Sequence, residues 1–225
     1  MMNFTFKTRS GFSMIELVMV IVVLGILASM ALPRLNRDLT EEAADSILSD
    51  IRYTQHLALM DNMHEHNDPK WQQKFWRIVF STCDSGNKHY YMIGSDTNKG
   101  SANNAFFAQP EAAIDPANGK AMFGNNTLCT TDGGPAVSDR IFITKKYGIN
   151  SVSFKRGCTG KGGKHLGFDN LGRPHYGFSQ STSPNYASYM TARCTMTFTL
   201  TNNDSFSINI EPETGYAFIV DQNSS

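Results

Sequence analysis

The sequence contains none of the short motifs that mark common catalytic sites. It lacks a Gly-x-Ser-x-Gly turn, a phosphate-binding glycine loop and a His-Glu-x-x-His motif. It also lacks a Cys-x-x-Cys pair, and no histidine stands at zinc-finger spacing from a cysteine. The six histidines are scattered without a clear acidic partner. We therefore expect no enzyme, no catalytic residue, no metal and no cofactor, with an enzyme anchored in a membrane as the alternative.

A charge imbalance is absent as well. The 225 residues include 20 basic and 20 acidic side chains. A balanced chain has no global attraction to nucleic acid or to a membrane surface, so only local clusters can bind them. The length suits one domain with an appendage. Asn, Ser, Thr and Gly are abundant after the first 60 residues, which favours turns and short strands there.

The sequence does contain one long apolar run, residues 11–33. Lys7 and Arg9 precede it with no acid, and positive charge keeps a flank cytoplasmic. From Phe12 to Leu32 is 21 residues, which as a helix measures about 31 Å and crosses a bilayer. We expect a single-pass span with a cytoplasmic N-terminus.

Glu16 lies near the start of this run. A carboxylate in an apolar span costs a few kcal/mol, so it needs a partner or a function unless it lies by chance at the membrane edge. After Pro33, apolar residues recur at helical spacing on one face: Ala44, Ile47, Leu48, Ile51, Ala58 and Leu59. The helix should continue to about Asn62, with a bend or local melting at Pro33.

The N-terminal residues carry a family resemblance. Lys-x-Arg-x-Gly followed by Phe-Ser-Met-Ile-Glu-Leu resembles the type III signal of type IV prepilins and pseudopilins. The resemblance implies that a prepilin peptidase cuts after Gly11 and N-methylates Phe12. It also implies that Glu16 pairs with a neighbouring subunit's N-terminal amine during assembly, and Pro33 matches a helix-kinking proline common in the family.

This resemblance implies an α+β pilin fold, in which a long N-terminal helix packs on an antiparallel β-sheet head. The expected divisions are a leader over 1–11, a transmembrane helix over 12–33, an amphipathic helix half over 34–62 and a periplasmic head over 63–225. The chain would sit in the bacterial inner membrane and then in a filament. Its partners would be other pilins or pseudopilins, the peptidase and the membrane.

The implied function is that of a minor pilin or pseudopilin in a type II secretion pseudopilus or type IV pilus, supporting protein secretion. Phrases over 51–62, 166–174 and 208–215 are similar to those of H-type minor pseudopilins and FimT-like minor pilins. The long stretch 96–140 departs from that pattern.

The four cysteines, Cys83, Cys129, Cys158 and Cys194, all follow the apolar run. Outside the cytoplasm an even count indicates two disulfides, and the alternative is four reduced, buried thiols. Of three possible connectivities we favour Cys83–Cys129 with Cys158–Cys194, because each pair brackets a separate stretch.

The head should be rich in strands. Alternating or β-branched segments predict strands over 75–81, 89–95, 141–145, 151–155, 164–169, 195–201, 206–210 and 216–220, the last three as an antiparallel meander. Residues 96–140 show little periodicity and predict a variable, partner-facing loop, or short helices over 102–107 and 110–114. Cys129 would attach this loop to the head.

Two polar clusters leave alternatives open. Lys155, Arg156, Lys161 and Lys164 surround Cys158, and this basic loop could hold the phosphates of DNA or be a solvated turn. DNA uptake is the alternative function that follows. His64, Glu65, His66 and Asp68 lie in a polar connector over 63–74 whose spacing suits a solvated loop better than a metal site.

Overall fold

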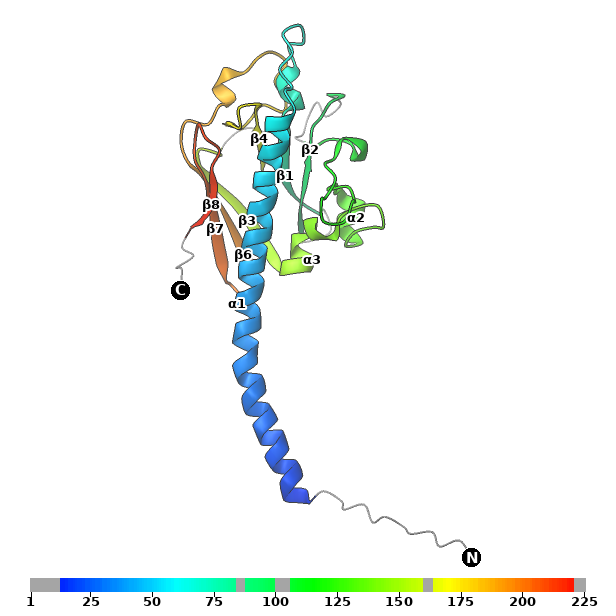
Figure 1. The fold of residues 1–225 in the computed structure, drawn as a ribbon, viewed down its shortest axis with the longest axis vertical. Helices are drawn as coiled ribbons and strands as arrows, with labels where there is room; N and C mark the ends of the chain where they lie inside the picture. The colour runs from blue at the N-terminus through cyan, green and yellow to red at the C-terminus, as the bar shows by residue number, and fades with distance from the viewer. Residues whose placement is uncertain (1–12, 84–87, 100–105, 160–163, 221–225) are drawn as a thin grey trace, which may run out of the picture. The chain divides into compact units, whose positions relative to one another are not determined.

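The computed structural model describes residues 13–83, 88–99, 106–159 and 164–220, without the side chains of 29–38. The chain divides into two compact units, Met1–Leu39 and Thr40–Ser225. Helix α1, Met14–Met60, begins in the first unit and ends in the second (Figure 1). Pro33 lies within these bounds, but its side chain is outside the description, so the bend stays a prediction.

The second unit contains the amphipathic half of α1. The residues predicted to face the head are buried there, namely Ala44, Ile47, Leu48, Ile51 and Ala58. Leu59 was expected on the same face but is 51 % exposed. It lies over Gly172, where an added Cβ would be 3.3 Å from the leucine side chain, so glycine leaves this last turn uncovered.

The first sheet has the order β2-β1-β4-β5, with antiparallel pairing throughout. Its strands are β1 Trp76–Thr82, β2 His89–Gly94, β4 His165–Phe168 and β5 Pro174–His175. The predicted hairpin of the first two strands is confirmed. The two-residue strand β5 was not expected, because it is too short to show an alternating pattern.

The second sheet has the order β3-β6-β7-β8 and is also antiparallel. Its strands are β3 Ile149–Arg156, β6 Cys194–Leu200, β7 Ser205–Ile210 and β8 Ala217–Val220. The predicted C-terminal meander is confirmed, and β6 alternates buried with half-buried residues as its sequence does. The α+β class holds, but the described residues form two sheets where one was expected.

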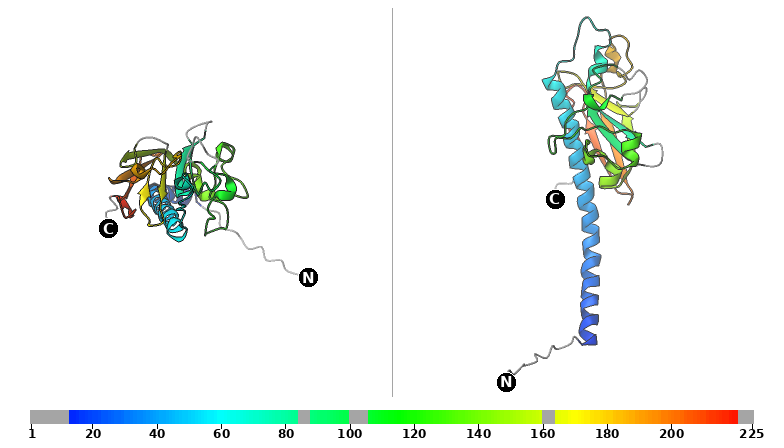
Figure 2. Two further views of the ribbon diagram at one scale, coloured as in Figure 1. Left: turned by 90° about the horizontal axis from the view of Figure 1, so that it is seen from above. Right: turned by 90° about the vertical axis from the view of Figure 1, so that its right-hand side faces the viewer.

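The two sheets share an aromatic core. The Phe80 ring on β1 lies 5.8 Å from that of Phe154 on β3 and 5.5 Å from that of Phe198 on β6. His89 Nε2 is 2.7 Å from the Asn150 carbonyl oxygen, which ties β2 to β3. Within the second unit, α1 packs along one side of the strands (Figures 1 and 2).

The strand predicted over 141–145 is wrong. These residues belong to the 3-10 turn η3, Asp139–Ile141, and to helix α3, Ile143–Tyr147. Ile141, Phe142 and Ile143 are β-branched or aromatic, which misled the prediction, but all three are buried, so they do not alternate between faces. Gly148, at φ 71°, ends the helix in the left-handed conformation that glycine favours.

The stretch 96–140 is partly ordered by short elements. It contains η2, Gln109–Glu111, and α2, Asn126–Thr130, which Asn125 caps by accepting a hydrogen bond from the Leu128 amide at 2.8 Å. The helix predicted over 110–114 is only the turn η2, and 100–105 lie outside the described residues. The polar connector ends in η1, Trp71–Lys74. There Gln72 and Gln73 are buried and donate to Asn185 and Ser181 carbonyls, so this part is no solvated loop.

Candidate functional site

The first turn of α1 positions Glu16. Gly11 and Phe12 lie outside the described residues, and the helix begins at Met14. Ser13 caps it, because its side-chain oxygen accepts a hydrogen bond from the Glu16 amide at 3.4 Å. Glu16 is exposed in the first turn, where the positive end of the helix dipole favours a carboxylate. The carboxylate is therefore exposed beside the start of the helix.

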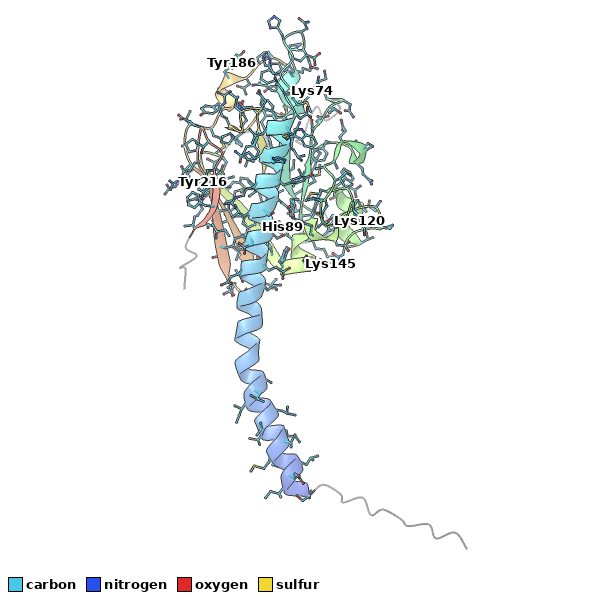
Figure 3. All side chains as sticks on the ribbon, in the orientation of Figure 1. Lys74, His89, Lys120, Lys145, Tyr186 and Tyr216 are labelled. Atoms are coloured by element: carbon cyan, nitrogen blue, oxygen red, sulfur yellow. A yellow bond between two sulfur atoms is a disulfide. The ribbon has the colours of Figure 1, made fainter. Side chains whose placement is uncertain are left out.

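The helix around Glu16 is apolar on every side. Met14 is 90 % exposed, and the large apolar residues from Ile15 to Leu27 are all at least half exposed. Figure 3 shows these side chains projecting outward around α1. A helix that is apolar all round is covered by lipid or by other protein when it functions. Among the residues described with side chains, no helix reaches the length and hydropathy required to cross a membrane.

Two disulfides join distant parts of the head. Cys83, after β1, is bonded to Cys129 in α2, and Cys158, after β3, to Cys194 at the start of β6. These are the two pairs that the sequence favoured. The first attaches the 96–140 stretch to the first sheet, and the second closes the turn that leaves β3.

The structure brings only part of the predicted basic cluster together. Lys155 and Arg156 are exposed at the end of β3, which we call the basic turn. Lys164 instead donates to the Val152 carbonyl oxygen at 2.8 Å, and Lys161 lies outside the described residues. The basic turn is thus smaller than the sequence indicated, but the neighbouring disulfide fixes it.

At the other end of β3 lies a buried charge network that the sequence did not reveal. Arg140 donates to both Asp50 on α1 and Asp115, the latter at 3.3 Å. The Tyr91 hydroxyl also donates to Asp50, and the Ser138 hydroxyl donates to Asp115 at 2.5 Å. Burial raises the pKa of Asp50 to about 6, although Tyr91 and Arg140 favour its charged form. The network ties α1 to the 96–140 stretch.

A cleft of about 410 Å³ opens beside this network. We call it the base cleft; it lies between α1, η3, α3 and the turn after Asp115. It is lined by Glu42, Ser46, Ala117, Asn118, Asp139, Arg140, Lys146 and Tyr147.

Comparison with known proteins bears on the N-terminal segment. Residues 6–32 match the family model of the prokaryotic N-terminal methylation motif. The match supports the type IV pilin and pseudopilin family, whose members are structural subunits, and it ends before the head begins. No curated protein and no solved structure is significantly similar to the chain.

The matched segment contains Gly11, Phe12 and Glu16, the residues predicted for processing and assembly. A motif of this kind implies, in general, a precursor processed by a prepilin peptidase and assembly with other pilins. The exposed apolar start of α1 is the surface through which such assembly would occur.

One histidine does have an acidic partner, contrary to expectation. His175 Nε2 lies 3.2 Å from Asp169 Oδ2, and its Nδ1 lies 2.9 Å from Ser188 Oγ. Burial opposes the charge on Asp169, but hydrogen bonds from His175 and Arg173 outweigh it and lower the pKa of Asp169 to about 2. The sequence did not predict the contact between Asp169 and His175, because the two residues come together only when the turn between β4 and β5 forms.

This serine–histidine–aspartate arrangement has the composition of a hydrolase triad but not the access. Ser188 is 3 % exposed and donates to the Asn185 carbonyl oxygen at 2.7 Å. A substrate carbonyl could not reach its hydroxyl without displacing that contact. The arrangement instead fastens the turn after β4 to the 185–188 segment.

The polar connector is held by ion pairs. Lys74 contacts Glu65 at 2.7 Å and Asp68 at 3.3 Å, and Lys99 contacts Asp68 at 2.9 Å. The His64 ring packs edge-on against Trp71. Across the described part of the chain, no three His, Cys, Asp or Glu side chains are grouped to hold a metal ion.

Proposed function

We propose that this chain is a minor pilin or pseudopilin, a structural subunit of a type II secretion pseudopilus or type IV pilus. The observation that carries the proposal is the methylation-motif match over residues 6–32. The exposed apolar helix with Glu16 in its first turn supports it. The sequence phrases in the head favour the H-type group, and protein secretion is the process that such a subunit serves.

The proposed mechanism couples processing to assembly through charge. Cleavage after Gly11 creates an ammonium group at Phe12, which the same enzyme methylates. Glu16 is costly in an apolar environment while it is alone and is stabilised beside such an ammonium. The carboxylate of an incoming subunit therefore favours the position where a neighbour's N-terminus lies, and the apolar helix surface becomes the filament core.

The proposed location follows from the same residues. The chain would be held in the bacterial inner membrane by residues 12–33, with Lys7 and Arg9 on the cytoplasmic side. The head would lie in the periplasm, an oxidising compartment in which the two disulfides persist.

Mass spectrometry of chain co-expressed with a prepilin peptidase tests the processing step. We expect a mature N-terminus at N-methylated Phe12, and an intact Met1 would refute the proposal. Glu16→Ala should be cut normally but enter filaments at least tenfold less, because it has lost the docking charge. Asp45→Ala, which removes an exposed carboxylate from the same helix, is the control and should assemble normally.

DNA uptake is the second candidate function. The basic turn favours it, since Lys155 and Arg156 are exposed and no ion pair to either is present among the described residues. Cations on a fixed turn can contact phosphates without reading sequence. The bond from Lys164 to Val152 and the scarcity of aromatic residues around the turn reduce the surface available for this contact.

A gel shift separates the two candidates. If the chain binds DNA, reversing the charge of Lys155, Arg156, Lys161 and Lys164 should abolish retention of a DNA duplex at low salt. An unchanged shift would eliminate the DNA candidate and leave the filament proposal intact.

A further inference from the structure

The base cleft has more negative than positive charge around it. Glu42 and Asp139 are exposed at the cleft, and Asp50 and Asp115 lie behind Arg140. Arg140 is already shared by these last two carboxylates. The remaining cation, Lys146, is 3.7 Å from Glu42, with both side chains more than 40 % exposed, so the pair is weak. At neutral pH the cleft therefore attracts a further cation.

The cleft is also large enough to receive side chains. Its volume of about 410 Å³ falls in the range of ligand-binding clefts, roughly 300–1,000 Å³. Its exposed carboxylates, Glu42 and Asp139, come from two different elements, α1 and η3. A turn that carries two neighbouring cations suits such a cleft.

The chain carries such a turn at the end of β3 that lies away from the cleft. Helix α3, which lines the cleft, leads into β3, and β3 ends at Lys155 and Arg156 (Figure 1). Eight residues of strand separate the two ends by about 25 Å. The basic turn of one molecule therefore cannot reach its own cleft, but it can reach the cleft of another copy aligned along β3.

We propose that the base cleft binds the basic turn, Lys155 and Arg156, of a second copy of this chain, so that heads associate end to end. Glu42 and Asp139 accept the two cations. The contact joins two different surfaces, so each copy keeps one of them free and the contact can repeat from copy to copy. It involves the head alone and goes beyond assembly through the N-terminal helix.

Zero-length cross-linking of the full chain in detergent micelles tests this contact. A carbodiimide couples a lysine amine to a carboxylate that touches it. In an equal mixture of ¹⁴N and ¹⁵N chains, we expect cross-links from Lys155 to Asp139 or Glu42 that combine both isotopes. The Glu42–Lys146 pair within one chain should also couple, and it reports a folded head. Its presence without mixed-isotope Lys155 cross-links would refute the proposal.

Reversing the charges separates this contact from association through the apolar helix. Asp139→Lys alone leaves two amines at positions 139 and 155, and Lys155→Glu with Arg156→Glu leaves two carboxylates, so neither variant can form the cross-link between these positions by itself. An equal mixture of these two variants should restore it, because each surface then meets its opposite charge. A mixture of the two variants that stays uncoupled would overturn the proposal.

Two further measurements identify what a failure means. Coupling between heads should fall at high salt, because the pairs are exposed. If the basic turn instead serves DNA, Asp139→Lys would leave DNA retention unchanged and wild-type heads would not couple. Cleavage after Gly11 is measured independently, so failure of this contact leaves the filament proposal standing, and failure of cleavage leaves the contact standing.

Discussion

Arg140→Ala is expected to lower the free energy of unfolding by about 3 kcal/mol, since removing one partner of a buried ion pair leaves the other charge uncompensated. Here one guanidinium serves two carboxylates, Asp50 and Asp115, whose side chains are 2 % and 0 % exposed. Arg140 is itself 20 % exposed, so the expected loss lies near the lower end for buried pairs. Urea unfolding of the oxidised full chain measures it as a shift in midpoint at constant slope.

The loss of stability in Arg140→Ala should depend on pH, whereas the loss of side-chain packing alone would not. The pKa of Asp50 is about 6 in the folded chain against 3.8 for the unfolded group. A raised pKa means that folding favours the protonated form, so this group's contribution to stability falls as pH rises from about 3.8 to about 6. Without Arg140 the pKa rises further and the decline extends to higher pH. The deficit of the variant should therefore be largest above about pH 7 and shrink towards about pH 4.

Lys146→Ala is the matched control. Lys146 lines the same cleft, and its replacement by alanine also removes one positive charge. Its ion pair with Glu42, however, is exposed. We expect a change within about 0.5 kcal/mol and no dependence on pH. An Arg140→Ala variant as stable as this control, or equally destabilised at both ends of the pH range, would show that the network does not hold α1 to the head through charge.

The sequence was most informative where local pattern determines structure. Ile47 and Ile51 follow the helical period and are buried as expected, and the alternation of β6 predicted both its strand and its faces. The cysteine pairs could be favoured because each brackets one stretch of chain. The processing residues were recognisable because a peptidase reads a short linear signal; Gly11 and Phe12 themselves remain predictions.

The parts that the sequence did not reveal depend on contacts between distant residues. Arg140 contacts Asp50, which is 90 positions away in the chain, and no local sequence pattern around either residue predicts the contact. Phe142 and Ile143 have strand-forming side chains, yet burial on all sides places them in a helical turn. The base cleft combines four segments of chain, so no spacing rule could have found it.

Gly157→Ala is expected to be the second severe change, with a loss of about 3 kcal/mol, at the upper end for overpacking. A Cβ at this position would lie 1.9 Å from the Ala192 carbonyl oxygen. The obstacle is backbone, and Gly157 also donates to the Arg193 carbonyl oxygen at 3.1 Å. The chains cannot easily separate, because the next residue, Cys158, is bonded to Cys194. Thermal or urea unfolding compares the variant with wild type.

Arg156→Gly is the control for this position, and it also separates folding from the contact between heads. Arg156 has φ 63°, a conformation that glycine adopts without steric cost. Glycine relieves the backbone strain of the folded state, but it also raises the conformational entropy of the unfolded chain. These two effects oppose each other, so the free energy of unfolding should change by less than about 0.5 kcal/mol. The variant loses one of the two cations offered to the base cleft, so it should fold normally and couple more weakly. Equal stabilities of Gly157→Ala and Arg156→Gly would mean that the basic turn can move away from Ala192, and a turn that free would not present its cations in the fixed position that end-to-end association requires.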